Sequence, residues 1–222
     1  MAKDRKQSRL LTVETGILGG SLSYFKDEEL VGCVVGKNDT SRAEDLVANA
    51  ESLLITHGVS VNELDTIVVS QGPGSYTGLR IGISTVLGMS SATNCKTVGV
   101  PLLDSINSQY EHQRGNLIIL PFGKKEFVWK FFDSGEMSID TASSPLINYY
   151  EDLGNLIEKH TDAQIICHSQ IRELLPPLNE NPITISGCLS SYLGYYYCKN
   201  IDLCSDLTPI YSFNPSKSNT LF

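Results

Sequence analysis

The amino-acid sequence predicts an α/β protein with two lobes, each built from a mixed β-sheet with helices packed on it. Three observations lead to this fold class. Short apolar runs and longer amphipathic runs follow one another in the order β-β-β-α-β-α-β. A glycine-rich loop at residues 70–82 joins one strand to the next helix. A second series of strands and helices then begins, so we expect a first lobe at residues 9–106 and a smaller second lobe at residues 107–222.

The first lobe begins with a meander of three strands, predicted at residues 10–15, 21–25 and 31–35. Gly19-Gly20 marks the first turn. The charged residues 26–29 separate the second and third strands, as an exposed turn does. The lobe therefore opens with consecutive strands rather than with a helix.

A helix is predicted after the meander, at residues 41–57. Residues 41–44 form a capping box, and an apolar stripe ends before Gly58. The stripe consists of Leu46, Val47, Ala50, Leu53 and Leu54. A helical turn is predicted next, at residues 60–64, followed by a strand at residues 66–69. The glycine-rich loop and a long helix then occupy residues 70–92, and a last strand occupies residues 97–100.

The second lobe is predicted to repeat the mixture of strands and helices. Strands are expected at residues 117–120, 126–132, 164–167 and 183–186, and helices at residues 146–160 and 189–199. The tail from residue 208 onward is rich in Ser, Asn and Pro, and we expect it to be extended or loose.

The glycine-rich loop allows two interpretations. Gly72 and Gly74 let backbone approach another group closely, and a helix N-terminus that follows a strand can hold an anion. The loop lacks the Gly-Lys-Ser/Thr ending of a Walker loop, and its glycine spacing differs from the dinucleotide fingerprint. Gly74, Gly78 and Gly82 are four residues apart, which gives a helix one flat face for close packing. Packing within the chain, a partner interface and a ligand loop all remain open.

The stretch from Glu63 to Ser105 resembles the signature region of the TsaB/YeaZ family. It has a strand, the run Gly72-Pro73-Gly74-Ser75-Tyr76-Thr77-Gly78-Leu79-Arg80-Ile81-Gly82, and a helix of small residues. The resemblance implies the actin-like and sugar-kinase-like (ASKHA) fold. It further implies a non-catalytic subunit that pairs with a larger TsaD-like paralogue, which forms threonylcarbamoyladenosine next to the anticodon of tRNA.

The same resemblance implies where the partners bind. Helices of the first lobe would pack against the paralogue through Leu46, Ala50, Leu53, Gly78, Leu79, Gly82, Ile83 and Val86. A TsaE-like P-loop ATPase would join the complex, and tRNA would be held only through the complex. We expect no catalytic residue and no cofactor in this chain, with ATP and a metal in the partner subunits. A homodimer through the same helices is the alternative when the chain is alone.

An enzyme remains the second hypothesis: an actin-fold ATPase or small-molecule kinase. Its nucleotide loop would consist of Glu14, Thr15, Gly72, Gly74 and Ser75. Family members usually have Asp-Thr-Ser where this chain has Glu14-Thr15-Gly16, and the longer glutamate side chain would displace a magnesium ion. A solvated strand end is the simpler interpretation of Glu14.

No metal site is predicted from the sequence. The catalytic paralogue of the family holds its metal through His-x-x-x-His, whereas no two histidines of this chain are four residues apart. His57 and His160 end predicted helices, where an imidazole interacts favourably with the helix dipole. Cys167 and His168 are neighbours on a strand and therefore point to opposite faces.

Composition narrows the class of protein further. A net charge of −8 argues against an autonomous nucleic-acid binder, because such a protein needs a concentrated basic surface. The longest apolar runs, such as residues 117–122, are too short to span a membrane, and no signal peptide is recognised, so we expect a cytoplasmic protein. The six cysteines include no C-x-x-C pair, and we expect them to be reduced thiols.

Overall fold

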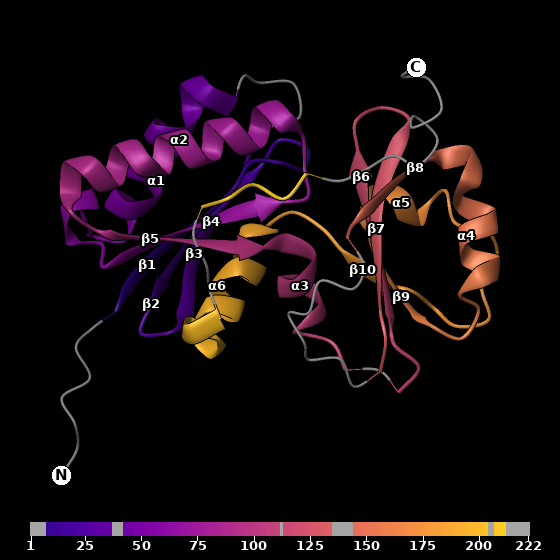
Figure 1. The fold of residues 1–222 in the computed structure, drawn as a ribbon. Helices are drawn as coiled ribbons and strands as arrows, with labels where there is room; N and C mark the ends of the chain where they lie inside the picture. The colour runs from indigo at the N-terminus through magenta and orange to yellow at the C-terminus, as the bar shows by residue number, and fades with distance from the viewer. Residues whose placement is uncertain (1–7, 37–41, 112, 135–143, 204–206, 212–222) are drawn as a thin grey trace, which may run out of the picture.

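The computed structural model of the chain describes residues 8–36, 42–111, 113–134, 144–203 and 207–211. Within them lie two five-stranded mixed sheets, one beside the other, with helices against each (Figure 1). This architecture confirms the two-lobed α/β prediction.

The first sheet has the strand order β3-β2-β1-β4-β5. Its strands are β1 (Arg9–Glu14), β2 (Ser21–Lys26), β3 (Glu29–Val35), β4 (Thr66–Gly72) and β5 (Lys96–Pro101). The strands β1, β2 and β3 form the predicted antiparallel meander, while β4 runs parallel to both β1 and β5. Every residue of β4 is buried, because helices cover both faces of the sheet at this strand.

Two helices lie on one face of the first sheet. They are α1 (Arg42–Thr56) and α2 (Tyr76–Thr93), and a 3₁₀ turn (Val61–Glu63) precedes β4. Leu11 and Val13 of β1 point toward α1 and α2, whereas Leu10 points to the other face, as the alternation of a strand requires. The predicted helices and strands of this lobe are confirmed within a few residues at each end.

The second sheet has the order β10-β9-β6-β7-β8. Its strands are β6 (Asn116–Phe122), β7 (Glu126–Phe132), β8 (Leu146–Tyr149), β9 (Gln164–His168) and β10 (Ile183–Ile185). Its helices are α4 (Leu153–Lys159) and α5 (Ser169–Arg172), with a 3₁₀ turn (Tyr150–Asp152) before α4. A second 3₁₀ turn (Ile201–Leu203) lies near the end of the chain.

The helix predicted at residues 146–160 is wrong in its first half. Residues 146–149 form β8, which pairs antiparallel with Glu126–Trp129 of β7, and the helix begins only at Leu153. The free edge of β7 can accept another strand, and a four-residue apolar run fits a strand as well as a helix. The short helices α3 (Leu102–Asn107) and α5 were not predicted.

The last helix, α6 (Ser190–Lys199), returns to the first sheet although it follows the second lobe in sequence. It covers the face opposite α1 and α2, beside α3 (Figure 1). Ser190 anchors its start: its carbonyl accepts a hydrogen bond from Thr12 Oγ1 at 2.8 Å, and its amide donates to Ser21 Oγ at 2.8 Å. The predicted boundary between the lobes at residue 106 stays a prediction. The helices that cover the first sheet come from both halves of the chain.

Cys33 of β3 and Cys188, just before α6, form a disulfide. The prediction of reduced thiols is therefore wrong for this pair. Cys95 and Cys167 are buried free thiols, and Cys198 is a half-buried one. Burial raises the pKa of Cys167 to about 11, which keeps it protonated and unreactive at neutral pH.

Among the described residues, no helix has the length and apolar character that crossing a membrane requires.

Candidate functional site

The glycine-rich loop connects the buried strand β4 to α2. Gly72 has φ +105°, a conformation that favours glycine, and its amide donates to Ser70 Oγ at 3.1 Å. Ser75 is the N-cap of α2, because its Oγ accepts from the amide of Gly78 at 3.1 Å. The predicted strand, loop and helix are thus present, with the helix N-terminus turned into the loop.

The loop packs against the end of β1 in the same chain. A Cβ on Gly74 would lie 2.5 Å from the Cα of Gly16, and the amide of Ser75 donates to the carbonyl of Gly16 at 2.8 Å. Thr15 Oγ1 donates to the carbonyl of Gly78 at 2.7 Å. A Cβ on Gly82 would collide with the same hydroxyl. The flat glycine face of α2 therefore receives Thr15 of this chain.

Residues 208–211 cover the other side of the loop. The amide of Ile210 donates to the carbonyl of Gln71 at 2.7 Å, and Gln71 Nε2 donates to the carbonyl of Thr208 at 3.1 Å. The rings of Tyr211 and Tyr76 lie 5.3 Å apart. Residues 208–211 form no helix or strand, in agreement with a tail predicted to be extended or loose, but these contacts hold them on the loop. The remainder of the tail lies outside the described part of the chain. Backbone from two other segments thus fills the space in which the second hypothesis places phosphate.

Glu14 is buried at the end of β1, with 1% of its surface exposed. Its Oε1 accepts hydrogen bonds from the amides of Gly16 at 2.5 Å and Ile17 at 2.9 Å. The prediction of a solvated strand end is therefore wrong. The carboxylate holds the turn between β1 and β2, which in turn supports the glycine-rich loop through Gly16.

The residues predicted for the partner interface are buried within this chain. They are Leu46, Ala50 and Leu53 of α1 and Gly78, Leu79, Gly82, Ile83 and Val86 of α2. Five of them, Leu46, Ala50, Leu53, Ile83 and Val86, belong to the core between the two helices and the first sheet. Their contact with a partner stays a prediction, and a partner that docked on these helices would meet the outward residues first.

A cleft of about 370 Å³ lies between the two lobes. Glu14 and Leu18 line it from the first lobe, His168 from the end of β9 in the second, and Leu189 from the segment before α6. Sequence reasoning placed Glu14 in a nucleotide site and did not predict a role for His168. The alternation of residues along β9 would have indicated which way His168 points, but not which other segments meet it there.

His57 and His160 lie at the ends of helices. His57 Nδ1 lies 2.8 Å from the carbonyl of Leu53, and His160 Nδ1 lies 3.0 Å from the carbonyl of Leu156. The predicted structural positions are confirmed for both. In the part of the chain that the structure describes, no group of three or more His, Cys, Asp or Glu residues could hold a metal ion.

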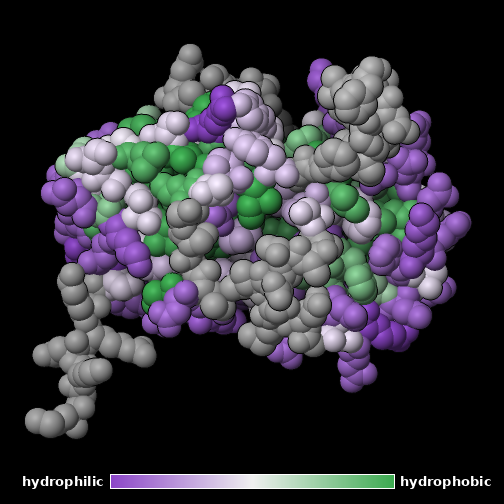
Figure 2. All heavy atoms as spheres, viewed as in Figure 1, coloured by the Kyte–Doolittle hydropathy of each residue, from purple (hydrophilic) through white to green (hydrophobic). Residues whose placement is uncertain are grey.

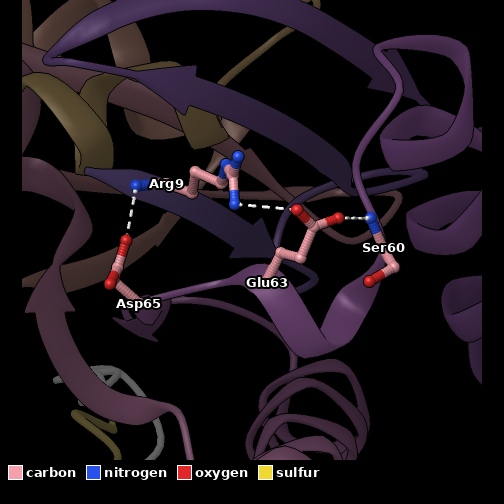
Figure 3. Close-up of polar contacts among 4 residues, drawn as sticks. All are labelled: Arg9, Ser60, Glu63 and Asp65. Atoms are coloured by element: carbon pink, nitrogen blue, oxygen red, sulfur yellow. Dashed lines mark hydrogen bonds and ion pairs between the residues drawn. The ribbon is translucent and has the colours of Figure 1, made fainter. Parts of the chain in front are cut away.

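An ionic network closes the opposite end of the first sheet (Figure 3). Arg9 Nη1 lies 2.9 Å from Glu63 Oε1, and the amide of Arg9 donates to Asp65 Oδ2 at 3.0 Å. Glu63 Oε2 also accepts from the amide of Ser60 at 2.9 Å. This backbone hydrogen bond, helped by the charge of Arg9, lowers the pKa of Glu63. The network fixes the start of β1 to the turn before β4.

A protein-family model described as "TsaD: tRNA N6-adenosine threonylcarbamoyltransferase" matches residues 38–206. The chain belongs to this family. Within it the chain is a TsaB/YeaZ member, as its signature loop predicted. It is 25% identical over 95 residues to "tRNA threonylcarbamoyladenosine biosynthesis protein TsaB" of Escherichia coli, a match that covers 43% of this chain and 41% of that protein.

An uncharacterized protein of Mycobacterium tuberculosis is 27% identical over 139 residues, which covers 61% of this chain and 64% of the relative. The match thus spans less than two thirds of each of these two curated relatives. YeaZ from Pseudomonas aeruginosa is similar in structure, with a TM-score of 0.60, 18% identity, and coverage of 93% of this chain and 99% of YeaZ. An uncharacterized Pseudomonas aeruginosa protein with similarity to YeaZ has a TM-score of 0.65 at 16% identity, with coverage of 93% and 98%. The predicted ASKHA fold is confirmed.

The outward faces of α1 and α2 in this TsaB/YeaZ member carry apolar residues that the sequence analysis assigned to no site. Val47, Ile55 and Leu87 are 50%, 63% and 47% exposed. Gly88 is exposed, with no atom within 4 Å of an added Cβ. Hydrophobic side chains gather on the side of the first lobe where α2 lies (Figure 2). Periodicity alone shows that both helices have an apolar stripe, but not which part of it the sheet leaves exposed.

Proposed function

We propose that the chain is a non-catalytic subunit of the complex that forms N6-threonylcarbamoyladenosine in tRNA. The observation that carries the proposal is the match of residues 38–206 to the family of tRNA N6-adenosine threonylcarbamoyltransferases. In this proposal the first lobe pairs with a TsaD-like paralogue that carries the catalytic site. A TsaE-like P-loop ATPase and the tRNA join through that paralogue, and ATP and the metal belong to the partner subunits.

The exposed surface of α1 and α2 supports the proposed pairing. Val47, Ile55 and Leu87 expose apolar area on helices that already pack against each other. Gly88 leaves an open position on α2 at which another helix can approach closely. The buried residues predicted for the interface would then hold α1 and α2 in position, and the exposed residues of these helices would contact the partner.

Two further observations support a role without catalysis. No two histidines are four residues apart, so the chain lacks the His-x-x-x-His that the resemblance implies for the catalytic paralogue. The glycine-rich loop is packed by Gly16 on one side and Ile210 on the other. Because other segments of the same chain pack against the loop, the loop's role is more consistent with positioning α2 than with binding a ligand.

The proposal is tested by purifying the tagged chain from its own cells under native conditions and identifying the bound proteins by mass spectrometry. We expect a larger paralogue with a His-x-x-x-His sequence. The variant Gly88→Trp should lose that paralogue while keeping the wild-type circular dichroism spectrum, because a Cβ added at Gly88 meets no atom within 4 Å. Gly154→Trp is the matched control, since Gly154 lies on α4 of the second lobe and also faces open space.

Recovery of the chain alone, or only with copies of itself, would contradict the heterodimer. In that case magnesium-dependent ATP binding by the purified chain, lost in Glu14→Gln, would support the ATPase or kinase hypothesis. Self-association lost in Gly88→Trp would support the homodimer instead.

A further inference from the structure

The disulfide between Cys33 and Cys188 joins the edge of the first sheet to the segment that comes back from the second lobe. Cys33 lies on β3, which is the last strand at one end of the first sheet. Cys188 lies between β10 of the second sheet and α6. A change in the oxidation state of this pair would therefore act on the connection between the two lobes.

The two cysteines differ in their access to solvent. Cys33 is exposed, whereas Cys188 is half-buried. In thiol–disulfide exchange an incoming thiolate must reach one of the two sulfur atoms, and the other sulfur becomes the leaving group. Access thus favours attack on Sγ of Cys33, with Sγ of Cys188 as the leaving group.

Hydroxyl groups lie beside the sulfur atom of Cys188. Ser23 Oγ is 3.1 Å from Cys188 Sγ and 2.6 Å from Ser190 Oγ, and both serines are buried. A disulfide sulfur carries no hydrogen, so the Ser23 hydroxyl is the donor, and the Ser190 hydroxyl can donate to Ser23 Oγ in turn. Hydrogen bonds to charged groups are stronger than those to neutral ones. The Ser23 hydroxyl would therefore stabilise Cys188 as it leaves as a thiolate.

We propose that Cys33 and Cys188 form a thiol–disulfide exchange site that a dithiol reductant switches. A thiolate of the reductant attacks Cys33 Sγ, the bond between the two cysteines breaks, and its electron pair leaves with Cys188 Sγ, which takes a proton from water. The second thiol of the reductant then attacks the reductant's own sulfur in the mixed disulfide and releases Cys33. The reductant becomes a disulfide, and the protein gains two electrons and two protons.

Reduction loosens the segment before α6 and leaves α6 in place. Residues 186–188 form no helix or strand, and the disulfide holds them to β3. Ser190 keeps its hydrogen bonds to Thr12 and Ser21, which anchor the start of α6. The switch is independent of the tRNA-modification function, since it rests on the two cysteines and not on the outer surface of α1 and α2.

The site of attack is tested with a monothiol, because the mixed disulfide then persists long enough to be trapped. The oxidised full-length chain is mixed with mercaptoethanol, quenched with N-ethylmaleimide in acid, and digested for mass spectrometry. We expect mercaptoethanol on Cys33 and maleimide on Cys188, with the reverse labelling at least about tenfold less abundant. This measurement uses the wild-type chain and does not depend on the folding of a variant.

Matched variants test the role of the hydroxyl group. Ser23→Ala removes the donor to Cys188 Sγ and should slow reduction by dithiothreitol about tenfold. Ser191→Ala is the control, because Ser191 Oγ donates to the carbonyl of Cys188 at 2.7 Å rather than to its sulfur. Its rate should stay within about twofold of the wild-type rate. A merely structural role of Ser23 would have the opposite effect, since a loosened fold exposes the disulfide and speeds its reduction.

Hydrogen exchange measures the consequence for the fold. In the reduced wild-type chain, residues 183–189 should lose protection relative to the oxidised chain, whereas β4 should keep it. Cys33→Ser should show the same pattern as the reduced chain, with or without dithiothreitol.

The proposal is overturned by any of three results. The first is a mercaptoethanol adduct found mainly on Cys188. The second is reduction of Ser23→Ala at the wild-type rate or faster. The third is a hydrogen-exchange pattern that does not differ between the oxidised and reduced chains.

Discussion

Gly82 illustrates how one missing Cβ determines the packing of a helix. Its Cα faces Thr15, whose hydroxyl donates to the carbonyl of Gly78 at 2.7 Å. We expect Gly82→Ala to lower the free energy of unfolding by about 1–3 kcal/mol, because the new methyl group collides with that hydroxyl. Urea denaturation measures the change. A double variant with Thr15→Ala should lose less than the sum of the two single losses.

Gly88 provides the opposite case on the same helix. An added Cβ meets no atom within 4 Å, so Gly88→Ala should raise the free energy of unfolding by about 1 kcal/mol through helix propensity alone. Equal effects at Gly82 and Gly88 would contradict the assignment of inner and outer faces on α2.

Glu63 should make stability depend on acid pH. Its pKa is lowered first by the hydrogen bond from the amide of Ser60 and also by the charge of Arg9 (Figure 3). A carboxylate with a lowered pKa stabilises the fold above its ordinary pKa of about 4.3, and this contribution is lost as the pH falls below that value. Glu63→Gln should therefore have a lower Tm than wild type at pH 7, and this difference in Tm should shrink as the pH falls from the ordinary pKa through the lowered pKa of Glu63. A difference in Tm that stays the same across an acid titration would show that the charge is not the cause.

The pairing of β3 with the segment before α6 gives a prediction at the scale of elements. The disulfide between Cys33 and Cys188 closes a sequence separation of 155 residues, and removing a bond of this kind costs about 2–4 kcal/mol. Cys33→Ser should lower the Tm of the oxidised protein. Dithiothreitol should lower the wild-type Tm to the same level and leave the variant unchanged. A wild-type Tm that does not respond to the reductant would contradict a stabilising bond.

Elements with a long periodic pattern were predictable from the sequence, and short ones were not. The apolar stripe predicted α1, and the strand-loop-helix order predicted β4 and α2. The predicted capping box of α1 begins at Ser41, which lies outside the described residues. Residues 146–149 could be assigned to β8 only from the free edge of β7, which is a tertiary feature. Cys33 and Cys188 lie in different lobes of the predicted order, so their pairing depends on the return of α6.

The candidate site was predictable in its loop but not in its surroundings. Gly72, Gly74 and Ser75 lie where the strand-loop-helix order placed them. The residues that pack against the loop are distant from it in sequence: Gly16 precedes it in the chain and Ile210 follows it. His168 meets Glu14 in one cleft only because two sheets lie side by side. Contacts of this kind follow from tertiary packing, which a single sequence does not reveal.

At the scale of the whole molecule, α6 connects the end of the chain to the first lobe. A Cβ on Gly194 would collide with the ring of Phe25, which is fully buried in β2. We expect Gly194→Val to lower the free energy of unfolding by about 1–3 kcal/mol or more. Hydrogen exchange should show the loss of protection in β1 and β2, far away in sequence. Gly154→Val on α4 is the control, because its Cβ meets open space.

The first sheet is synthesised early, whereas α6, which covers one of its faces, is synthesised near the end of the chain. A ribosome that has released residues 9–106 has delivered all five strands of the first sheet, but not the helix that covers one of its faces. Leu10, Phe25 and Val68 then stay exposed until residues 190–199 emerge. The nascent chain then exposes this apolar surface while its second half is translated, and exposed surface of this kind favours aggregation during that interval.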